Sequence, residues 1–127
     1  MNKIIATLFL SFTLLACSAG QSQNKTSKKV NPIEFNALSV KENTIILDVR
    51  TPQEFNLGHI PKAQNIDFRS SDFENLISSL DKETTYLVYC HSGVRSSNAI
   101  SKMKKLGFKY LYDLKGGFVS YKNQITK

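Results

Sequence analysis

The stretch Tyr86-Leu-Val-Tyr-Cys90-His-Ser-Gly-Val-Arg95-Ser-Ser joins an apolar run to a segment with helical periodicity. The run is rich in aromatic and β-branched side chains, which is typical of a buried strand. After it, the side chains of Ala99, Ile100, Met103 and Leu106 are spaced to share one face of a helix. The loop between strand and helix has a cysteine at one end and an arginine at the other. Backbone N–H groups in such a loop can converge on an anion.

From residue 32 onward, predicted strands alternate with predicted helices. Further strands are expected at residues 44–50, 63–67 and 110–114, and further helices from Asn31-Pro32, over 52–56 and 70–80, and after Gly116-Gly117. In the first of these helices we expect Ile33, Ala37 and Leu38 or Val40 to form the apolar face. The alternation predicts an α/β fold of three layers, with a small, mostly parallel central sheet and helices on both faces. Ligands of such sheets bind at the carboxyl ends of the strands, where Cys90 and Asp48 to Arg50 fall.

Cys90 is the candidate nucleophile of the loop. Gly93 can adopt the positive φ that a tight loop needs, so that successive N–H groups form a nest around the sulfur. The positive end of the following helix and the charge of Arg95 would further stabilise a thiolate, which is the reactive form of cysteine. A buried structural thiol is the alternative for Cys90.

Length and charge limit the range of functions. The 127 residues leave room for one domain, because about the first 30 differ in composition from the rest. The formal net charge is +7, but residues 32–127 hold 13 basic and 10 acidic side chains, a difference of only +3. So small an excess argues against nucleic-acid binding. No His or carboxylate cluster has metal-ligand spacing, so we predict no metal and no other cofactor.

The first 31 residues have the composition of an export signal followed by a linker. A positively charged start, Met1 to Lys3, precedes an apolar run of 13 residues, Ile4 to Ala16, too short to span a bilayer as a permanent helix. Residues 17–31 are mostly small or polar, which predicts a flexible tether. Its lysines could contact anionic lipid or simply be solvated.

Leu14-Leu-Ala-Cys17 resembles the lipobox of bacterial lipoproteins. The resemblance implies that residues 1–16 are a lipoprotein signal peptide and that lipid on Cys17 anchors the protein in the cell envelope, on the periplasmic or outer face of a bacterial membrane. Two or more acyl chains anchor a protein stably. The alternative is an ordinary signal peptide cleaved after Ala16 or Ala19. With Cys17 acylated, Cys90 would have no disulfide partner in the chain.

Four segments resemble, in order along the chain, signatures of the rhodanese family of sulfurtransferases. They are Leu47 to Phe55, Gly58 to Ile66, the loop Cys90 to Ser96, and Leu114 to Phe118. The resemblance covers about residues 32–127 and implies one rhodanese-like domain, with Tyr121 where many members have tryptophan. It implies that Cys90 takes a sulfane sulfur from a small anionic donor such as thiosulfate, becomes a persulfide, and passes the sulfur to cyanide or a thiol.

The resemblance also implies roles for the residues around Cys90. The loop residues that would hold the persulfide and its donor are His91, Ser92, Gly93, Val94 and Arg95, and Arg95 would help to bind the anionic donor. His91 and Ser92 resemble the variable positions of the family loop, and they either tune the choice of acceptor or are simply exposed to solvent. Asp48, Arg50 and Glu54 resemble positions that form structural ion pairs beneath the loop rather than catalytic groups, and His59 resembles a hydrogen-bonded framework residue rather than a base.

Two other functions stay open. Cell-cycle phosphatases and some arsenate reductases have a related loop, but theirs is one residue longer between cysteine and arginine, which gives phosphate a wider cradle. A non-enzymatic persulfide carrier or binding module for a membrane-associated partner would keep both Cys90 and Arg95. We expect the domain to act as a monomer.

Overall fold

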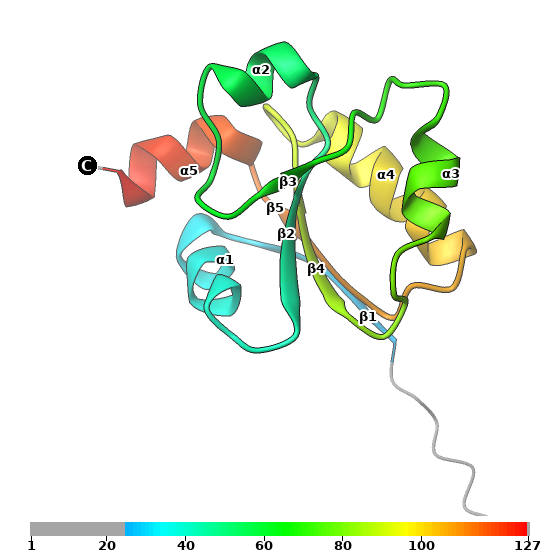
Figure 1. The fold of residues 1–127 in the computed structure, drawn as a ribbon. Helices are drawn as coiled ribbons and strands as arrows, with labels where there is room; N and C mark the ends of the chain where they lie inside the picture. Colours follow the sequence, from blue (N-terminus) through cyan, green and yellow to red (C-terminus); the bar gives the residue numbers. More distant parts are fainter. Residues whose placement is uncertain (1–24, 127) are drawn as a thin grey trace, which may run out of the picture.

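The computed structural model describes residues 25–126, which form a parallel sheet of five strands in the order β1-β5-β4-β2-β3. Helices cover both faces of the sheet, so the structure is the three-layer α/β fold that the sequence predicts (Figure 1). The strands are β1 (Thr26–Val30), β2 (Thr44–Asp48), β3 (Gln64–Asn65), β4 (Thr85–Tyr89) and β5 (Tyr110–Leu114), and the helices are α1 (Pro32–Ser39), α2 (Pro52–Asn56), α3 (Phe73–Ser78), α4 (Val94–Lys105) and α5 (Gly117–Ile125).

Strand β1 corrects the prediction that a flexible tether extends to residue 31. Residues 26–30 pair in parallel with β5 at the edge of the sheet, and Val30 is buried. The composition of this segment conceals the strand, because Val30 is its only buried side chain and the other four are polar and partly or fully exposed. An edge strand needs few apolar residues, and lysines at an edge discourage pairing with other chains. The folded domain therefore begins before Pro32.

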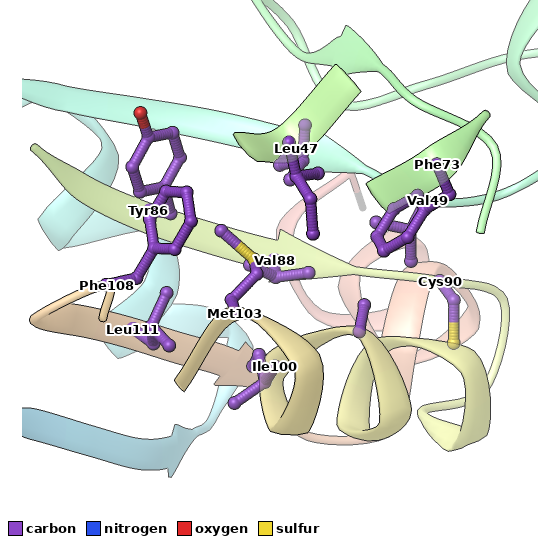
Figure 2. Close-up of a cluster of buried hydrophobic side chains, with 12 residues drawn as sticks. Leu47, Val49, Phe73, Tyr86, Val88, Cys90, Ile100, Met103, Phe108 and Leu111 are labelled. Carbon is purple, nitrogen blue, oxygen red and sulfur yellow. The ribbon is translucent and has the colours of Figure 1, made fainter. Parts of the chain in front are cut away.

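Side chains of the strands alternate between two hydrophobic cores. In β4, Tyr86 and Val88 belong to the core under α3 and α4, whereas Leu87 and Tyr89 belong to the core under α1 and α5. Cys90 follows β4 directly and continues this alternation on the α3–α4 face. Figure 2 shows its side chain at the end of that cluster, with the sulfur directed towards the first turn of α4. The pleat of the strand thus fixes the direction of the sulfur.

Helix α1 starts where the sequence predicts, but it buries a different face. The side chain of Asn31 caps its first turn and Pro32 stands at the first helical position. Of the predicted apolar face, Ile33 is 67% and Val40 82% exposed and Ala37 is exposed as well, so that only Leu38 packs against the core as expected. The helix instead inserts Phe35 into the core. In a helix of eight residues the apolar positions are too few for periodicity to select one face.

Three predicted elements are shorter in the structure. The strand expected over residues 44–50 ends at Asp48, the strand expected over 63–67 pairs at only Gln64 and Asn65, and the helix expected over 70–80 spans 73–78. Within the described part of the chain, no helix has both the length and the apolar character that crossing a bilayer requires.

Val30→Ala tests whether β1 belongs to the domain. The change removes two buried methyl groups and should lower the free energy of unfolding by about 2 kcal/mol. Ser27→Ala alters an exposed position of the same strand and should change it by less than about 0.5 kcal/mol. Denaturant unfolding measures both. Equally small effects would contradict the docking of β1 in the sheet.

Candidate active site

The sulfur of Cys90 lies inside the loop that joins β4 to α4. Cys90 is 1% exposed, and the Gly93 N–H donates to its Sγ at an N···S distance of 3.0 Å. Gly93 has the expected positive φ, +117°, while an added Cβ there would meet no atom within 4 Å. Glycine is therefore needed for the backbone conformation rather than for space. The side chains of His91, Ser92 and Val94 are exposed around the buried sulfur.

A buried series of hydrogen bonds leads from Cys90 away from the loop. The thiol donates to Ser96 Oγ at 3.5 Å, and Ser96 donates to Asp113 Oδ1 at 2.7 Å. Ser97 donates to the other carboxylate oxygen of Asp113 at 2.8 Å. Ser96 is 0% and Asp113 4% exposed. Asp113 is not among the predicted site residues, although a lone acidic residue inside an apolar strand is a signal that could have identified it.

The guanidinium of Arg95 is paired with Glu54. Its Nη1 and Nη2 donate to the two carboxylate oxygens at 2.7 and 2.8 Å. These hydrogen bonds are the main reason why the pKa of Glu54 lies far below its ordinary value; partial burial opposes them, and bonds from Thr51 add to them. Glu54 also forms the capping box of α2 with Thr51. Sequence reasoning expected Glu54 in an ion pair but did not identify Arg95 as its partner.

Asp48 and Arg50 form the other expected ion pair. Arg50 Nη2 lies 2.6 Å from Asp48 Oδ2 and also donates to the Gly58 carbonyl oxygen at 2.7 Å. The two side chains are 0% and 3% exposed, and the guanidinium packs 4.3 Å from the centre of the Phe118 ring. Removing either partner would leave a buried charge without its counter-ion, so the pair is part of the framework.

His59 makes framework contacts as well. Its Nδ1 lies 2.9 Å from the Phe55 carbonyl oxygen, and its ring stacks on that of Phe55 with 3.7 Å between centroids. Among residues 25–126, no three His, Cys, Asp or Glu side chains are grouped so as to hold a metal ion. Cys17, the predicted lipidation site, lies outside the described residues.

The Gly116-Gly117 turn holds the loop at the start of α5. The Phe118 N–H donates to the Cys90 carbonyl oxygen at 2.8 Å, and the Val119 N–H donates to that of His91 at 3.2 Å. Gly117 has a φ of +61°, and an added Cβ would lie 2.4 Å from the His91 oxygen. Glycine is required here for both conformation and space. The sequence shows the double glycine, but not its contact with the loop.

Two cavities flank the loop. One, of about 240 Å³, is lined by residues that include Arg50, Glu54, His91, Phe118 and Lys122. The other, of about 390 Å³, is lined by residues that include Lys29, Ser97, Asn98, Asp113 and Lys115. The loop is thus accessible from two sides, although the sulfur itself is buried.

A buried thiol thus lies at the carboxyl end of a strand in a parallel sheet, where it accepts a hydrogen bond from a backbone N–H of a short loop. These features define an α/β protein whose site is centred on a cysteine. The family model of the rhodanese-like domain matches residues 31–124. The chain therefore belongs to the rhodanese-like domain family.

Individual relatives agree with this assignment. The chain is 33% identical over 107 residues to the tRNA uridine(34) hydroxylase of Pelagibacter ubique, a match that covers 84% of this chain and 36% of that protein. It is 35% identical over 92 residues to the thiosulfate sulfurtransferase GlpE of Pseudomonas putida, covering 72% of this chain and 81% of that protein. The chain spans about a third of the length of the tRNA hydroxylases that it matches.

A solved structure shows the same fold. The crystal structure of a rhodanese-related protein from Thermoplasma volcanium superimposes with a TM-score of 0.67 at 26% identity, covering 77% of this chain and 93% of that one. The resemblance to rhodaneses inferred from four short segments is thereby confirmed at the level of family and fold.

Gly117→Ala tests the contact between the double-glycine turn and the loop. It should lower the free energy of unfolding by more than about 2 kcal/mol, because backbone strain and the clash with the His91 oxygen add together. Gly107→Ala is the matched control: φ there is +93° but the nearest atom is 3.7 Å away, so only strain is expected, about 1 kcal/mol. Equal losses in denaturant unfolding would argue against a tight contact at Gly117.

Proposed function

We propose that this protein is a sulfurtransferase in which Cys90 carries the sulfur. The Cys90 thiolate attacks the outer sulfur of a sulfane donor such as thiosulfate, so that a new S–S bond forms while the S–S bond of the donor breaks and sulfite leaves. Cyanide or a thiol then takes the outer sulfur and Cys90 is regenerated. The observation that carries this proposal is the position of Cys90 Sγ inside a six-residue loop, 3.0 Å from the Gly93 nitrogen.

The electrostatics of the loop support this chemistry. Helix α4 is twelve residues long and begins at Val94, so its positive end lies next to the sulfur. Backbone N–H groups aimed at a developing negative charge need no rearrangement during the reaction. A persulfide anion would therefore be stabilised in the same place as a thiolate.

The binding of an anionic donor is assigned to several groups together. Glu54 neutralises much of the charge of Arg95. Arg95 can therefore help to bind the donor only by sharing its guanidinium between the donor and Glu54. Lys122 and His91 both line the cavity of about 240 Å³ beside the loop and add donors at its mouth. We propose that these groups and the loop N–H groups bind the donor together.

Other activities are less well supported. The relatives named tRNA uridine(34) hydroxylase match this chain over about a third of their length, so hydroxylation is not proposed for it. A persulfide carrier would use the same Cys90 chemistry and differ only in its acceptor, which would be a partner protein instead of a small molecule.

The sulfurtransferase proposal is tested with thiosulfate and cyanide. The purified protein should release thiocyanate, and Cys90→Ser should abolish the reaction because the nucleophile is lost. Circular dichroism of the variant checks that it is folded, and intact-protein mass spectrometry detects the added sulfur atom on Cys90. Activity that survives in Cys90→Ser would refute the assignment. A stoichiometric sulfur adduct without turnover would favour the carrier.

We also propose that lipid on Cys17 anchors the domain to a cell-envelope membrane, on the strength of the motif Leu14 to Cys17. Mass spectrometry of protein extracted from bacterial membranes should find a diacylglyceryl group on Cys17. Cys17→Ser should release the protein from the membrane fraction, because two acyl chains are what makes anchoring stable. An N-terminus produced by cleavage after Ala19, or a free thiol at Cys17, would contradict the anchor.

A further inference from the structure

Ser96 has one hydroxyl hydrogen and three neighbours that compete for it. Its Oγ lies 2.7 Å from Asp113 Oδ1, 3.1 Å from the Gly93 carbonyl oxygen and 3.5 Å from Cys90 Sγ. The hydrogen bond to the carboxylate is the shortest and is charge-assisted, so it takes the hydrogen. Towards Cys90, Ser96 can then only accept a hydrogen bond, and that bond exists only while the sulfur keeps its proton.

We propose that Asp113 controls the protonation of Cys90 through Ser96 and holds the resting sulfur as a thiol. Asp113 does not touch the sulfur and is thus a positioning residue, whereas Ser96 contacts the reacting atom. The inference rests on the proposed function, because it assumes that Cys90 is the nucleophile. The effect of Asp113 is opposite to that of the Gly93 N–H, which donates to the sulfur and favours the thiolate.

Ionisation of Cys90 by this route is a shift of two protons. The S–H bond breaks as its proton passes to Ser96 Oγ, and the original Ser96 O–H bond breaks as that proton passes to Asp113 Oδ1. One negative charge moves from the carboxylate to the sulfur, and the total charge of the three groups is unchanged. The electron pair left on sulfur then forms the bond to the donor sulfur.

The groups around Asp113 fit this role. From β1, Lys29 Nζ lies 4.0 Å from Asp113 Oδ2, and from α4 the Ser97 hydroxyl donates to the same oxygen. Lys115, after β5, lines the same cavity as Asp113, through which water can exchange a proton. On the side of the sulfur, the charge of Arg95 is paired with Glu54. Lys29 and Lys115 therefore favour the resting negative charge on Asp113 rather than on the sulfur.

The test measures alkylation of Cys90 by iodoacetamide against pH, in a Cys17→Ser background where Cys90 is the only cysteine. Asp113→Asn keeps the shape of the side chain but removes its charge, so that the Ser96 hydrogen can turn to the sulfur. The midpoint of the alkylation profile should fall by about one pH unit, which raises the rate below the midpoint about tenfold. Asp81→Asn, at an exposed carboxylate, is the control and should leave the midpoint in place.

Ser96→Ala separates the hydroxyl route from simple charge repulsion. If Ser96 holds the thiol, its removal should lower the midpoint, and Asp113→Asn added to it should shift the midpoint much less than it does alone. A rise in the Ser96→Ala variant would show that Ser96 donates to a thiolate, and would overturn the inference. Equal shifts from Asp113→Asn in both backgrounds would overturn it as well.

These outcomes are independent of sulfur transfer, because alkylation uses no sulfur donor. The expected shifts without any thiocyanate release would reject the proposed function and leave the role of Asp113 intact. Thiocyanate release that depends on Cys90, with no shift in Asp113→Asn, would reject the role of Asp113 alone. Circular dichroism of each variant excludes unfolding as the cause, and the Ser96→Ala profile decides the matter if Asp113→Asn does not fold.

Discussion

The parallel pairing of β4 with β2 on one side and β5 on the other is the constraint on which the site depends. In this register Asp48 stands opposite Tyr89, and Asp113 stands opposite Val88. Three residues that are far apart in the sequence therefore lie together at the carboxyl ends of the strands: Asp48, Cys90 and Asp113. Because all three strands run in one direction, their polar carboxyl ends lie side by side, while their apolar parts fill the two cores.

The loop around Cys90 is held by contacts from several elements. The start of α5 binds its first two carbonyl oxygens, α2 receives the guanidinium of Arg95 through Glu54, and the hydroxyls of α4 connect it to β5. A short loop has few internal contacts, so its shape has to come from its neighbours. Groups fixed in this way can stabilise charge without first reorganising. The ion pair between Arg95 and Glu54 accordingly fixes the shape of the loop, but it also neutralises much of the positive charge of Arg95.

Local patterns in the sequence predict the elements of this fold well. Residues 52–56 and 110–114 have the predicted type and bounds, and Cys90 lies at the strand end where the apolar run stops. Partners that depend on long-range contact were not predictable from one sequence: Arg95 meets Glu54 across 41 positions, and Ser96 meets Asp113 across 17. Strand β1 was missed because an edge strand with one buried side chain has no apolar periodicity. In these cases the tertiary structure, and not local propensity, selects the outcome.

The site combines two opposing influences on one sulfur atom. The loop N–H and the positive end of α4 favour a thiolate, while the carboxylate of Asp113, acting through Ser96, favours the thiol. Thiolates are the form of cysteine that oxidants attack, so an influence that favours the thiol also limits oxidation. The sulfur is buried, and Ser96 Oγ lies 3.5 Å away as an acceptor for a proton on it. A domain exposed to oxidants in the cell envelope, as proposed here, would have a physical reason to keep both.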